Sequence, residues 1–238
     1  MPTLLKVSRQ PDGCPEIFYS VQGEGLYTGR PAVFLRLAHC NLSCSWCDTK
    51  YTWDWRTYDP LKQIINIPLG EIQTQILKYG CKYLVVTGGE PMIQQKQLIL
   101  LLQDFKSRGY FIEVETNGTI LPDPRLNELI GHWSVSPKLA NSGNPQVSRE
   151  IPECFGFFSA SPHSHFKYVI RDQTDFDEVR NMMNIYGMAA GKVILMPEAQ
   201  RTEDLINKSR WLVELCKTEG CLFSTRLQIL LWGDKRGV

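Results

Sequence analysis

Short apolar runs alternate along the chain with longer stretches of mixed polarity. Six of the runs have the length and the β-branched and aromatic content of buried strands; they lie at residues 32–38, 83–87, 111–116, 133–136, 166–170 and 193–196. Four intervening stretches carry apolar residues near i, i+3 and i+4 and end at a glycine, which predicts helices; they lie at residues 69–80, 95–109, 175–187 and 203–220. Strands that alternate with helices favour an α/β fold with a parallel sheet, either doubly wound or curled toward a barrel.

Two further segments have a less regular pattern. Residues 139–163 are rich in Asn, Ser, Gly and Pro, and we expect an irregular connection there. The apolar run LQILLW at 227–232 is expected to form a further strand at the edge of the sheet. Because no internal repeat and no clear linker interrupts the pattern, the sequence predicts one domain over residues 1–238.

Composition places the chain among ordinary globular proteins. Hydrophobic residues make up 43% and charged residues 21% of the 238 residues, which excludes the disordered, collagen-like and disulfide-rich miniprotein classes. A formal net charge of +1 gives no electrostatic reason to expect a nucleic acid partner. The first residues lack a secretory signal, and the longest apolar stretch is much shorter than the ~20 residues that span a membrane, so a cytoplasmic protein without a membrane segment is expected.

Polar and glycine-rich residues follow most of the predicted strands. CNLSCSWC follows the first strand, TGGEP the second, ETNGT the third, SPK the fourth and PEAQ the sixth. The carboxyl ends of parallel strands meet at one rim of a barrel, which is where such folds place their active sites. We therefore expect these five segments to surround one site.

Three cysteines in the first of these segments, Cys40, Cys44 and Cys47, have the spacing CxxxCxxC. A cubane iron–sulfur cluster normally takes four cysteine thiolates, so three predict one iron that is open to a small molecule. A structural zinc site is the alternative; it needs four closed ligands, usually in two separated pairs, and His39 is a candidate fourth ligand.

With eight cysteines and no export signal, reduced thiols and a metal site are expected rather than disulfides. The downstream cysteines form no second CxxC pair; they are Cys81, Cys154, Cys216 and Cys221.

Trp46 occupies the aromatic position of a longer pattern, CxxxCxΦC, and with it the triad resembles the signature of the radical S-adenosylmethionine (radical SAM) superfamily. The resemblance implies a [4Fe–4S] cluster whose open iron chelates the amino and carboxylate groups of S-adenosylmethionine. One electron that reaches the cluster from flavodoxin or ferredoxin then cleaves this cofactor to a 5′-deoxyadenosyl radical. The resemblance also implies a partial (β/α)6 TIM-like barrel as the fold.

The segment Gly88-Gly89-Glu90-Pro91 resembles the GGEP motif of the same superfamily, which meets the amino group of the cofactor. Taken alone, a Gly-Gly pair after a strand is more often a simple turn, and the same holds for the SPK segment. The resemblance implies that the cofactor contacts the following residues: Trp46, Asp48, Gly88, Gly89, Glu90, Ser136, Pro137, Lys138, Pro197 and Glu198.

A wider set of motifs narrows the family. VQGEG, FLRLAHC, CSWCDTKYTW, VTGGEP, ETNGT, SPK and LLWGDKRG occur in this order and strongly resemble the 7-carboxy-7-deazaguanine synthases, the QueE-type lyases of 7-deazapurine and queuosine biosynthesis. Family members convert 6-carboxy-5,6,7,8-tetrahydropterin to 7-carboxy-7-deazaguanine with loss of ammonia, and they use S-adenosylmethionine and magnesium. The resemblance implies a radical ring contraction in which the hydrogen removed from the substrate is returned, so that the cofactor is regenerated. It also implies a homodimer.

The same resemblance assigns residues to the substrate. Gln22 and the backbone of Val21 and Gly23 would meet the pterin edge, because an amide offers both donors and an acceptor. Arg36 would pair with the substrate carboxylate through its two-pronged guanidinium. A structural ion pair, with Glu24 as a candidate partner, is the alternative for Arg36, since an unpaired buried arginine is costly.

Further positions complete the implied site. Thr49 resembles the family's magnesium ligand, although a turn or helix cap is the commoner use of a threonine, and Asp48 is an alternative ligand. Thr87 would touch the substrate, and so would the carboxylate of Val238, for which an ordinary frayed tail is the alternative. The four histidines are expected to be structural; they are His39, His132, His163 and His165.

Two other functions use parts of the same pattern. A glycyl-radical activase would need the same cysteine triad, but VQGEG, Arg36 and the lack of a second, ferredoxin-like cysteine set disfavour it. A zinc-stabilised RNA-binding module is disfavoured by the near-neutral charge and by the absence of paired zinc half-sites.

Overall fold

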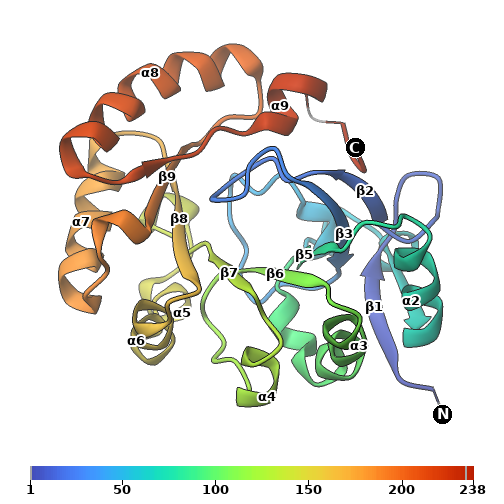
Figure 1. The fold of residues 1–238 in the computed structure, drawn as a ribbon. Coiled ribbons are helices and arrows are strands. Elements are labelled where there is room, and N and C mark those ends of the chain that lie inside the picture. The colour runs from blue at the N-terminus through green and yellow to red at the C-terminus, as the bar shows by residue number, and fades with distance from the viewer. Residues whose placement is uncertain (1, 234) are drawn as a thin grey trace.

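Six parallel strands form the centre of a curved ten-stranded sheet in the computed structural model, which describes residues 2–233 and 235–238 (Figure 1). The six are β3 (Pro31–Leu37), β5 (Tyr83–Gly88), β6 (Phe111–Thr116), β7 (His132–Val135), β8 (Ser164–Ile170) and β9 (Val193–Pro197). Each pairs in parallel with the next in this order. All six strands predicted from the sequence are therefore confirmed.

Four short strands extend the sheet at its two ends; they are β1 (Leu4–Ser8), β2 (Ile17–Val21), β4 (Ile64–Pro68) and β10 (Leu222–Phe223). At one end β1 and β2 run antiparallel to β3, and β4 runs antiparallel to β1. At the other end β10 runs parallel to β9. Among the described residues no strand pairing joins β10 to β2, so the expected partial barrel is confirmed, and backbone hydrogen bonds leave one side of it open.

The helices lie on the outer, convex side of the curved sheet (Figure 1). All four predicted helices are present: α2 (Leu69–Leu77), α3 (Gln95–Ser107), α7 (Gln173–Tyr186) and α8 (Thr202–Glu219). In α3, Leu98, Leu101, Leu102 and Phe105 recur at helical spacing, and all four are fully buried. Burying each such side chain stabilises the fold by ~1.5–3 kcal/mol. No helix in the described part of the chain is both long and apolar enough to cross a membrane.

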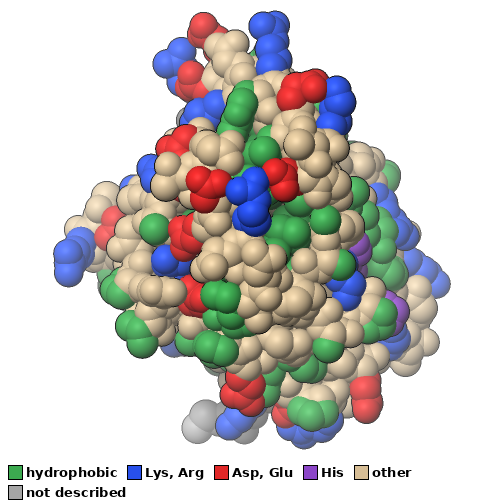
Figure 2. Space-filling view, turned by 90° about the vertical axis from the view of Figure 1, so that its left-hand side faces the viewer, with side chains coloured by type: hydrophobic (Ala, Val, Ile, Leu, Met, Phe, Trp, Pro, Cys, Tyr) green, Lys and Arg blue, Asp and Glu red, His purple; other side chains and the backbone are tan. Residues whose placement is uncertain are grey.

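Shorter helices connect these elements; they are α1 (Pro60–Gln63), α4 (Pro124–Asn127), α5 (Gln146–Arg149), α6 (Pro152–Ala160) and α9 (Leu227–Trp232). On the face formed by α7 and α8, acidic and basic side chains lie interspersed among apolar ones (Figure 2). Arg180 of α7 pairs with Glu219 at the end of α8, with 2.7 Å between their charged atoms. The mixture of charges on this face agrees with the net charge of +1.

Two segments differ from the prediction. LQILLW forms the helix α9 instead of an edge strand, and only Ile229 of its side chains is buried. A short apolar run has no periodicity that distinguishes a strand from a buried helix, which explains the error. The connection at 139–163 contains α6, where Pro152 occupies the first turn and Phe155 and Phe158 are fully buried. Its Pro and Ser residues suggested a loop, whereas proline is well suited to a helix start.

Candidate active site

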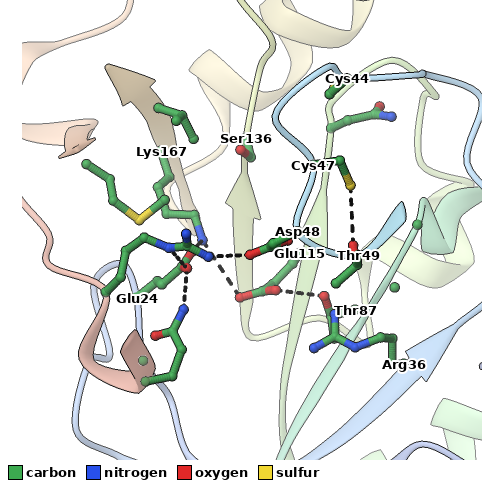
Figure 3. A pocket seen from close by; sticks show the side chains of 18 of the residues that line it. Glu24, Arg36, Cys44, Cys47, Asp48, Thr49, Thr87, Glu115, Ser136 and Lys167 are labelled. Carbon is green, nitrogen blue, oxygen red and sulfur yellow. Dashed lines mark hydrogen bonds and ion pairs between the residues drawn. The ribbon is translucent and has the colours of Figure 1, made fainter. Parts of the chain in front are cut away.

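A cavity of about 260 Å³ opens at the carboxyl ends of the parallel strands. Side chains of a strand alternate between its two faces, so every second residue points into the barrel. Several of the parallel strands contribute an inward-pointing side chain to the cavity; these side chains include Arg36 of β3, Thr87 of β5, Glu115 of β6, Lys167 of β8 and Met196 of β9. Figure 3 shows several of these side chains, which converge from different strands. All five segments that were expected to surround one site contribute residues to this cavity.

The three cysteines line this cavity together. Their loop follows β3, and each sulfur accepts a hydrogen bond from an N–H group. The donors are Leu42 N for Cys40 (3.5 Å), Asn144 Nδ2 for Cys44 (3.3 Å) and Trp53 Nε1 for Cys47 (3.4 Å). N–H donors aimed at sulfur are typical of thiolates that hold iron–sulfur clusters. The donor set thus fits a cluster with three protein ligands.

Burial favours the protonated thiol at Cys40 and at Cys44. Burial, with a smaller contribution from Glu90, raises the pKa of the Cys40 thiol to about 12. Burial likewise raises the pKa of Cys44. Metal binding by cysteine requires the thiolate, so assembly of a cluster would release protons. Within the described residues, no group of three or more His, Cys, Asp or Glu side chains is arranged to hold a single metal ion.

The two glycines of the GGEP segment lie directly against the cysteine loop. Gly89 N donates to Leu37 O (3.0 Å), and Glu90 N donates to His39 O (2.8 Å). A Cβ added at Gly88 or Gly89 would lie under 3.0 Å from the carbonyl oxygen of Leu37 or His39 respectively. Gly88 also has φ +151°, which L side chains rarely adopt. Only glycine fits this approach of two backbones, and both glycines line the cavity.

Glu90 and Pro137 are the two predicted cofactor residues that do not line the cavity. The Glu90 carboxylate is fully buried behind the wall and accepts hydrogen bonds from Met92 N (2.9 Å), Thr116 Oγ1 (2.8 Å) and Asn117 N (2.6 Å). Burial raises the pKa of Glu90 despite these three donors. In this position the carboxylate fastens the loop after β5 to the loop after β6.

The other predicted cofactor residues all line the cavity; they are Trp46, Asp48, Gly88, Gly89, Ser136, Lys138, Pro197 and Glu198. Lys138 Nζ donates to the backbone oxygen and to Oγ of Ser136, at 2.7 Å each, and lies 5.6 Å from the centroid of the Trp46 ring. The carboxylate of Glu198 pairs with Lys208 (2.9 Å). The carboxylate of Asp48 pairs with Arg226.

The residues predicted to meet the substrate also line the cavity; they are Val21, Gln22, Gly23, Arg36, Thr87 and Val238. The amide nitrogen of Gln22 donates to both Glu113 and Glu115, at 3.1 Å each. Both amide hydrogens are thus already in use, which the sequence did not indicate. Thr87 Oγ1 donates to the second oxygen of Glu115 (2.7 Å).

Arg36 forms an ion pair, but its partner is Glu16 and not the expected Glu24. Arg36 Nε lies 2.9 Å from Glu16 Oε1. Glu16 is fully buried and also accepts from Tyr51 Oη (2.9 Å) and from Arg236 Nη2 (3.1 Å). Within the described residues the two terminal nitrogens of Arg36 make no hydrogen bond, and Figure 3 shows the guanidinium beside Thr87. The ion pair and a role in ligand binding are therefore compatible.

Thr49, the predicted magnesium ligand, lines the cavity next to the cysteine loop. Its Oγ1 lies 3.5 Å from Cys47 Sγ (Figure 3). A hydroxyl in this position can reach a cation in the cavity, because magnesium accepts single protein oxygens and completes its shell with water and substrate oxygens.

Several cavity residues were missed by the sequence analysis; they are Glu115, Asn117, Lys167, Arg226 and Gln228. Glu115 and Lys167 are charged residues within buried strands, and this signal was available in the sequence. Arg226 and Gln228 follow the two-residue strand β10, which has no recognisable pattern. Their place at the cavity depends on the tertiary fold alone.

Glu24 is the centre of a buried group of charges in the same wall. It accepts from Lys167 Nζ (2.6 Å), Arg226 Nε (3.0 Å) and Gln228 Nε2 (2.7 Å). Burial by itself would raise the pKa of Glu24, but the positive charges of Lys167 and Arg226 outweigh it and hold the pKa well below its usual range. Burial would lower the pKa of Lys167, but Glu24 and Glu115 outweigh it and raise that pKa. Glu24, Lys167 and Arg226 therefore all stay charged at neutral pH.

Comparison with known proteins first defines the class. Residues 36–136 match the family model described as the radical SAM superfamily. This range includes the cysteine loop, the GGEP segment and Ser136, so the match, the partial barrel and the three-cysteine site together define a radical SAM protein. The chain also superposes on the crystal structure of QueE from Escherichia coli with a TM-score of 0.68 and 23% identity, over 93% of this chain and 94% of that one, which shows a shared fold.

Curated relatives then give the family. The chain is 37% identical over 225 residues to the 7-carboxy-7-deazaguanine synthase of Pyrobaculum aerophilum, covering 93% of this chain and 95% of the relative. It is 32% identical over 221 residues to the enzyme of the same name from Hyperthermus butylicus, covering 91% of each. The chain belongs to the 7-carboxy-7-deazaguanine synthase family.

Proposed function

We propose that the protein converts 6-carboxy-5,6,7,8-tetrahydropterin to 7-carboxy-7-deazaguanine with release of ammonia, as a radical SAM lyase of 7-deazapurine biosynthesis. One observation carries the proposal. A single cavity holds the three cysteines together with charged side chains suited to a carboxylated heterocycle, in a chain whose similarity to the synthases extends over nearly its full length.

Cys40, Cys44 and Cys47 would hold a [4Fe–4S] cluster, which with S-adenosylmethionine supplies the radical that removes a hydrogen atom. The cavity wall next to these cysteines would receive the cofactor. Gly88 and Gly89 let the end of β5 pack against the backbone that leads into the cysteine loop, and Ser136 fixes the ammonium of Lys138 in the wall. Glu90 would act only indirectly, by holding the loop that carries both glycines.

Arg36 would bind the carboxylate of the substrate. Glu16 occupies its Nε and fixes the plane of the guanidinium, which leaves the two terminal nitrogens for a bidentate pair. Glu115 offers acceptor oxygens to the N–H groups of the pterin, and Gln22 and Thr87 orient that carboxylate. In this arrangement Gln22 serves the pterin edge through Glu115 and through its neighbouring backbone, since its own amide hydrogens are committed.

Thr49 would contribute the one protein ligand of a magnesium ion, with water and substrate oxygens completing the shell. Asp48 is the weaker candidate for this role, because its carboxylate already pairs with Arg226. For the electron donor we retain flavodoxin or ferredoxin, and for the assembly a homodimer, both from the family resemblance. We retain one domain over residues 1–238 and a cytoplasmic location from the sequence pattern and the cysteine content.

The test is a reaction with defined components under anaerobic conditions. The cluster-loaded, reduced protein receives 6-carboxytetrahydropterin and S-adenosylmethionine, with and without magnesium, and the product is identified by mass. We expect 7-carboxy-7-deazaguanine, faster turnover with magnesium, and about four irons per chain. Cleavage of S-adenosylmethionine without any deazaguanine product would contradict the proposed substrate.

Arg36→Ala provides a site-specific arm of the same test. We expect the KM for the pterin to rise at least about tenfold, because one lost charge-assisted pair is worth ~1.5–3 kcal/mol, while the cluster absorbance stays unchanged. Arg56→Ala, at an exposed arginine outside the cavity, is the matched control. Loss of the cluster in Arg36→Ala would instead assign Arg36 a structural role.

A further inference from the structure

The open side of the barrel is closed by loops instead of strand pairing. We call this contact the seam; it joins residues 22–25, which follow β2, to residues 224–228, which follow β10. Leu227 N donates to Gly23 O (2.8 Å), and Gly25 N donates to Ser224 Oγ (2.7 Å). A Cβ at Gly23 would collide with the side chain of Gln228, so the two segments pack closely. The seam is one wall of the active-site cavity.

A chain of four charges runs across the seam. Lys167 pairs with Glu24, Glu24 pairs with Arg226, and Arg226 pairs with Asp48 (Figure 3). Arg226 is buried, and its remaining terminal nitrogen donates to the backbone oxygen of Ala199 after β9. One guanidinium therefore contacts three segments that are distant in sequence. A buried charge needs such complete pairing, since removing one partner leaves the others uncompensated.

The two carboxylates bound by Arg226 belong to different halves of the site. Asp48 directly follows Cys47 and moves with the loop that carries the three cysteines. Glu24 lies two residues from Gln22, in the loop that lines the cavity with Val21 and Gly23. We propose that Arg226 is a positioning residue that ties the cysteine loop to the 22–25 loop across the seam, and thereby couples binding of S-adenosylmethionine to binding of the substrate. The identity of that substrate rests on the proposed function.

Arginine is suited to this task where lysine is not. The planar guanidinium presents N–H groups in several fixed directions, so Glu24, Asp48 and Ala199 O can be bound at once. An ammonium group is a compact charge and cannot span the same three positions. Arg226→Lys should therefore behave like the neutral variant Arg226→Gln in the experiments below.

Hydrogen exchange of the cluster-loaded protein tests, without any substrate, whether Arg226 links the two loops. In Arg226→Gln we expect amide exchange to rise at least about fivefold in both the 22–25 and the 44–50 segments, because both lose a shared anchor. Asp48→Asn removes the same link at a partly exposed side chain and should release the 44–50 segment without disturbing the fold. Arg210→Gln, at an exposed arginine of α8, is the matched control and should change neither segment. A rise confined to residues 224–228 would overturn the proposal that Arg226 links the two loops.

Equilibrium binding tests the coupling. The Kd of S-adenosylmethionine is measured on the cluster-loaded protein with and without 6-carboxytetrahydropterin. We expect the pterin to tighten cofactor binding at least about fivefold in the unmodified protein and in Arg210→Gln. In Arg226→Gln and Asp48→Asn the ratio should fall close to one, and in Arg226→Gln the Kd measured without pterin should change less than about threefold. Full coupling in Asp48→Asn would overturn the proposal, as would its absence from the unmodified protein.

The two experiments also separate this inference from the proposed function. A protein that binds S-adenosylmethionine but no pterin contradicts the proposed substrate and with it the coupling. The exchange experiment then still decides whether Arg226 holds the two loops together.

Discussion

At the scale of single residues, two glycines let two stretches of backbone lie directly against each other in the site. Gly88 and Gly89 lie against the carbonyl groups of Leu37 and His39, which precede Cys40. The position of the cysteine loop therefore depends on having glycine, which has no side chain, at both positions at the end of β5. This dependence explains why a Gly-Gly pair occurs there independently of any contact with a ligand.

We predict that Gly89→Ala lowers the free energy of unfolding by at least about 3 kcal/mol, because the new Cβ collides with His39 O and neither backbone can move freely. Urea denaturation of the metal-free protein measures the effect. Gly70→Ala in α2 is the control, since a Cβ there meets nothing within 4 Å; it should leave stability unchanged or raise it by up to ~1 kcal/mol. Equal stability of the two variants would contradict this account.

Residue identities at the site were more predictable than residue contacts. The motifs identified the cysteines, Arg36 and Thr49, and all of them line one cavity. The pairing of Arg36 with Glu16 and of Gln22 with two glutamates was not predictable, because it depends on which side chains neighbouring strands bring alongside. The orientation of Glu90 was not predictable either, since its carboxylate is buried behind the loop that carries the GGEP motif.

At the scale of elements, the strongly patterned strands and helices were predictable and the weakly patterned ones were not. β1, β2 and β4 were missed because each is short and partly exposed, so no long apolar run marks it. The helix α9 was mistaken for a strand for the reason given above. The central strands carry charged residues on their inner face without losing their place in the sheet, because those side chains have polar partners: Lys167 lies 3.9 Å from Glu115 of β6, and Glu115 also accepts from Thr87 of β5.

Two histidines, one on β7 and one on β8, lie in contact across these neighbouring strands. His132 Nε2 lies 3.2 Å from His165 Nδ1. Burial, together with His132 and Lys192, lowers the pKa of His165 to about 4 from an ordinary value of 6.5. Since the unfolded chain then binds the proton more tightly, the stabilisation is complete above pH 6.5 and is lost as the pH falls toward 4.

We predict that the free energy of unfolding falls between pH 7 and pH 4.5 by about 1 kcal/mol more in the unmodified protein than in His165→Gln. The full shift would correspond to more, at ~1.4 kcal/mol per pKa unit, but His165 is only partly buried and solvent reduces the effect. Urea denaturation at the two pH values measures it. His163→Gln, at an exposed histidine of the same segment, should retain the pH dependence of the unmodified protein.

At the scale of the whole molecule, side chains join the first and the last segments of the described chain. Arg236 contacts Glu16, Gln63 Oε1 (3.3 Å) and the backbone of Arg9, and its guanidinium lies 3.3 Å from the centroid of the Tyr51 ring. Glu16 and Arg236 are separated by 220 residues. No spacing rule in the sequence predicts such a pair, because both residue types are common on surfaces.

We predict that Arg236→Gln lowers the free energy of unfolding by about 1–2 kcal/mol. The loss is moderate because Glu16 keeps Arg36 and Tyr51 as partners and is not left unpaired. Thermal or urea denaturation measures it, with Lys235→Gln, at the exposed neighbouring lysine, as the control. Identical stability of the two variants would show that the contacts of Arg236 contribute nothing to the fold.

The hydrogen bonds to the cysteine sulfurs have a consequence for electron transfer. Asn144, which donates to Cys44, stands 100 residues further along the chain, in a connection that contributes no ligand. Donors to cluster sulfurs stabilise the reduced state and so raise the reduction potential. A cluster held by these cysteines would therefore have its reduction potential set partly by an asparagine outside the cysteine motif.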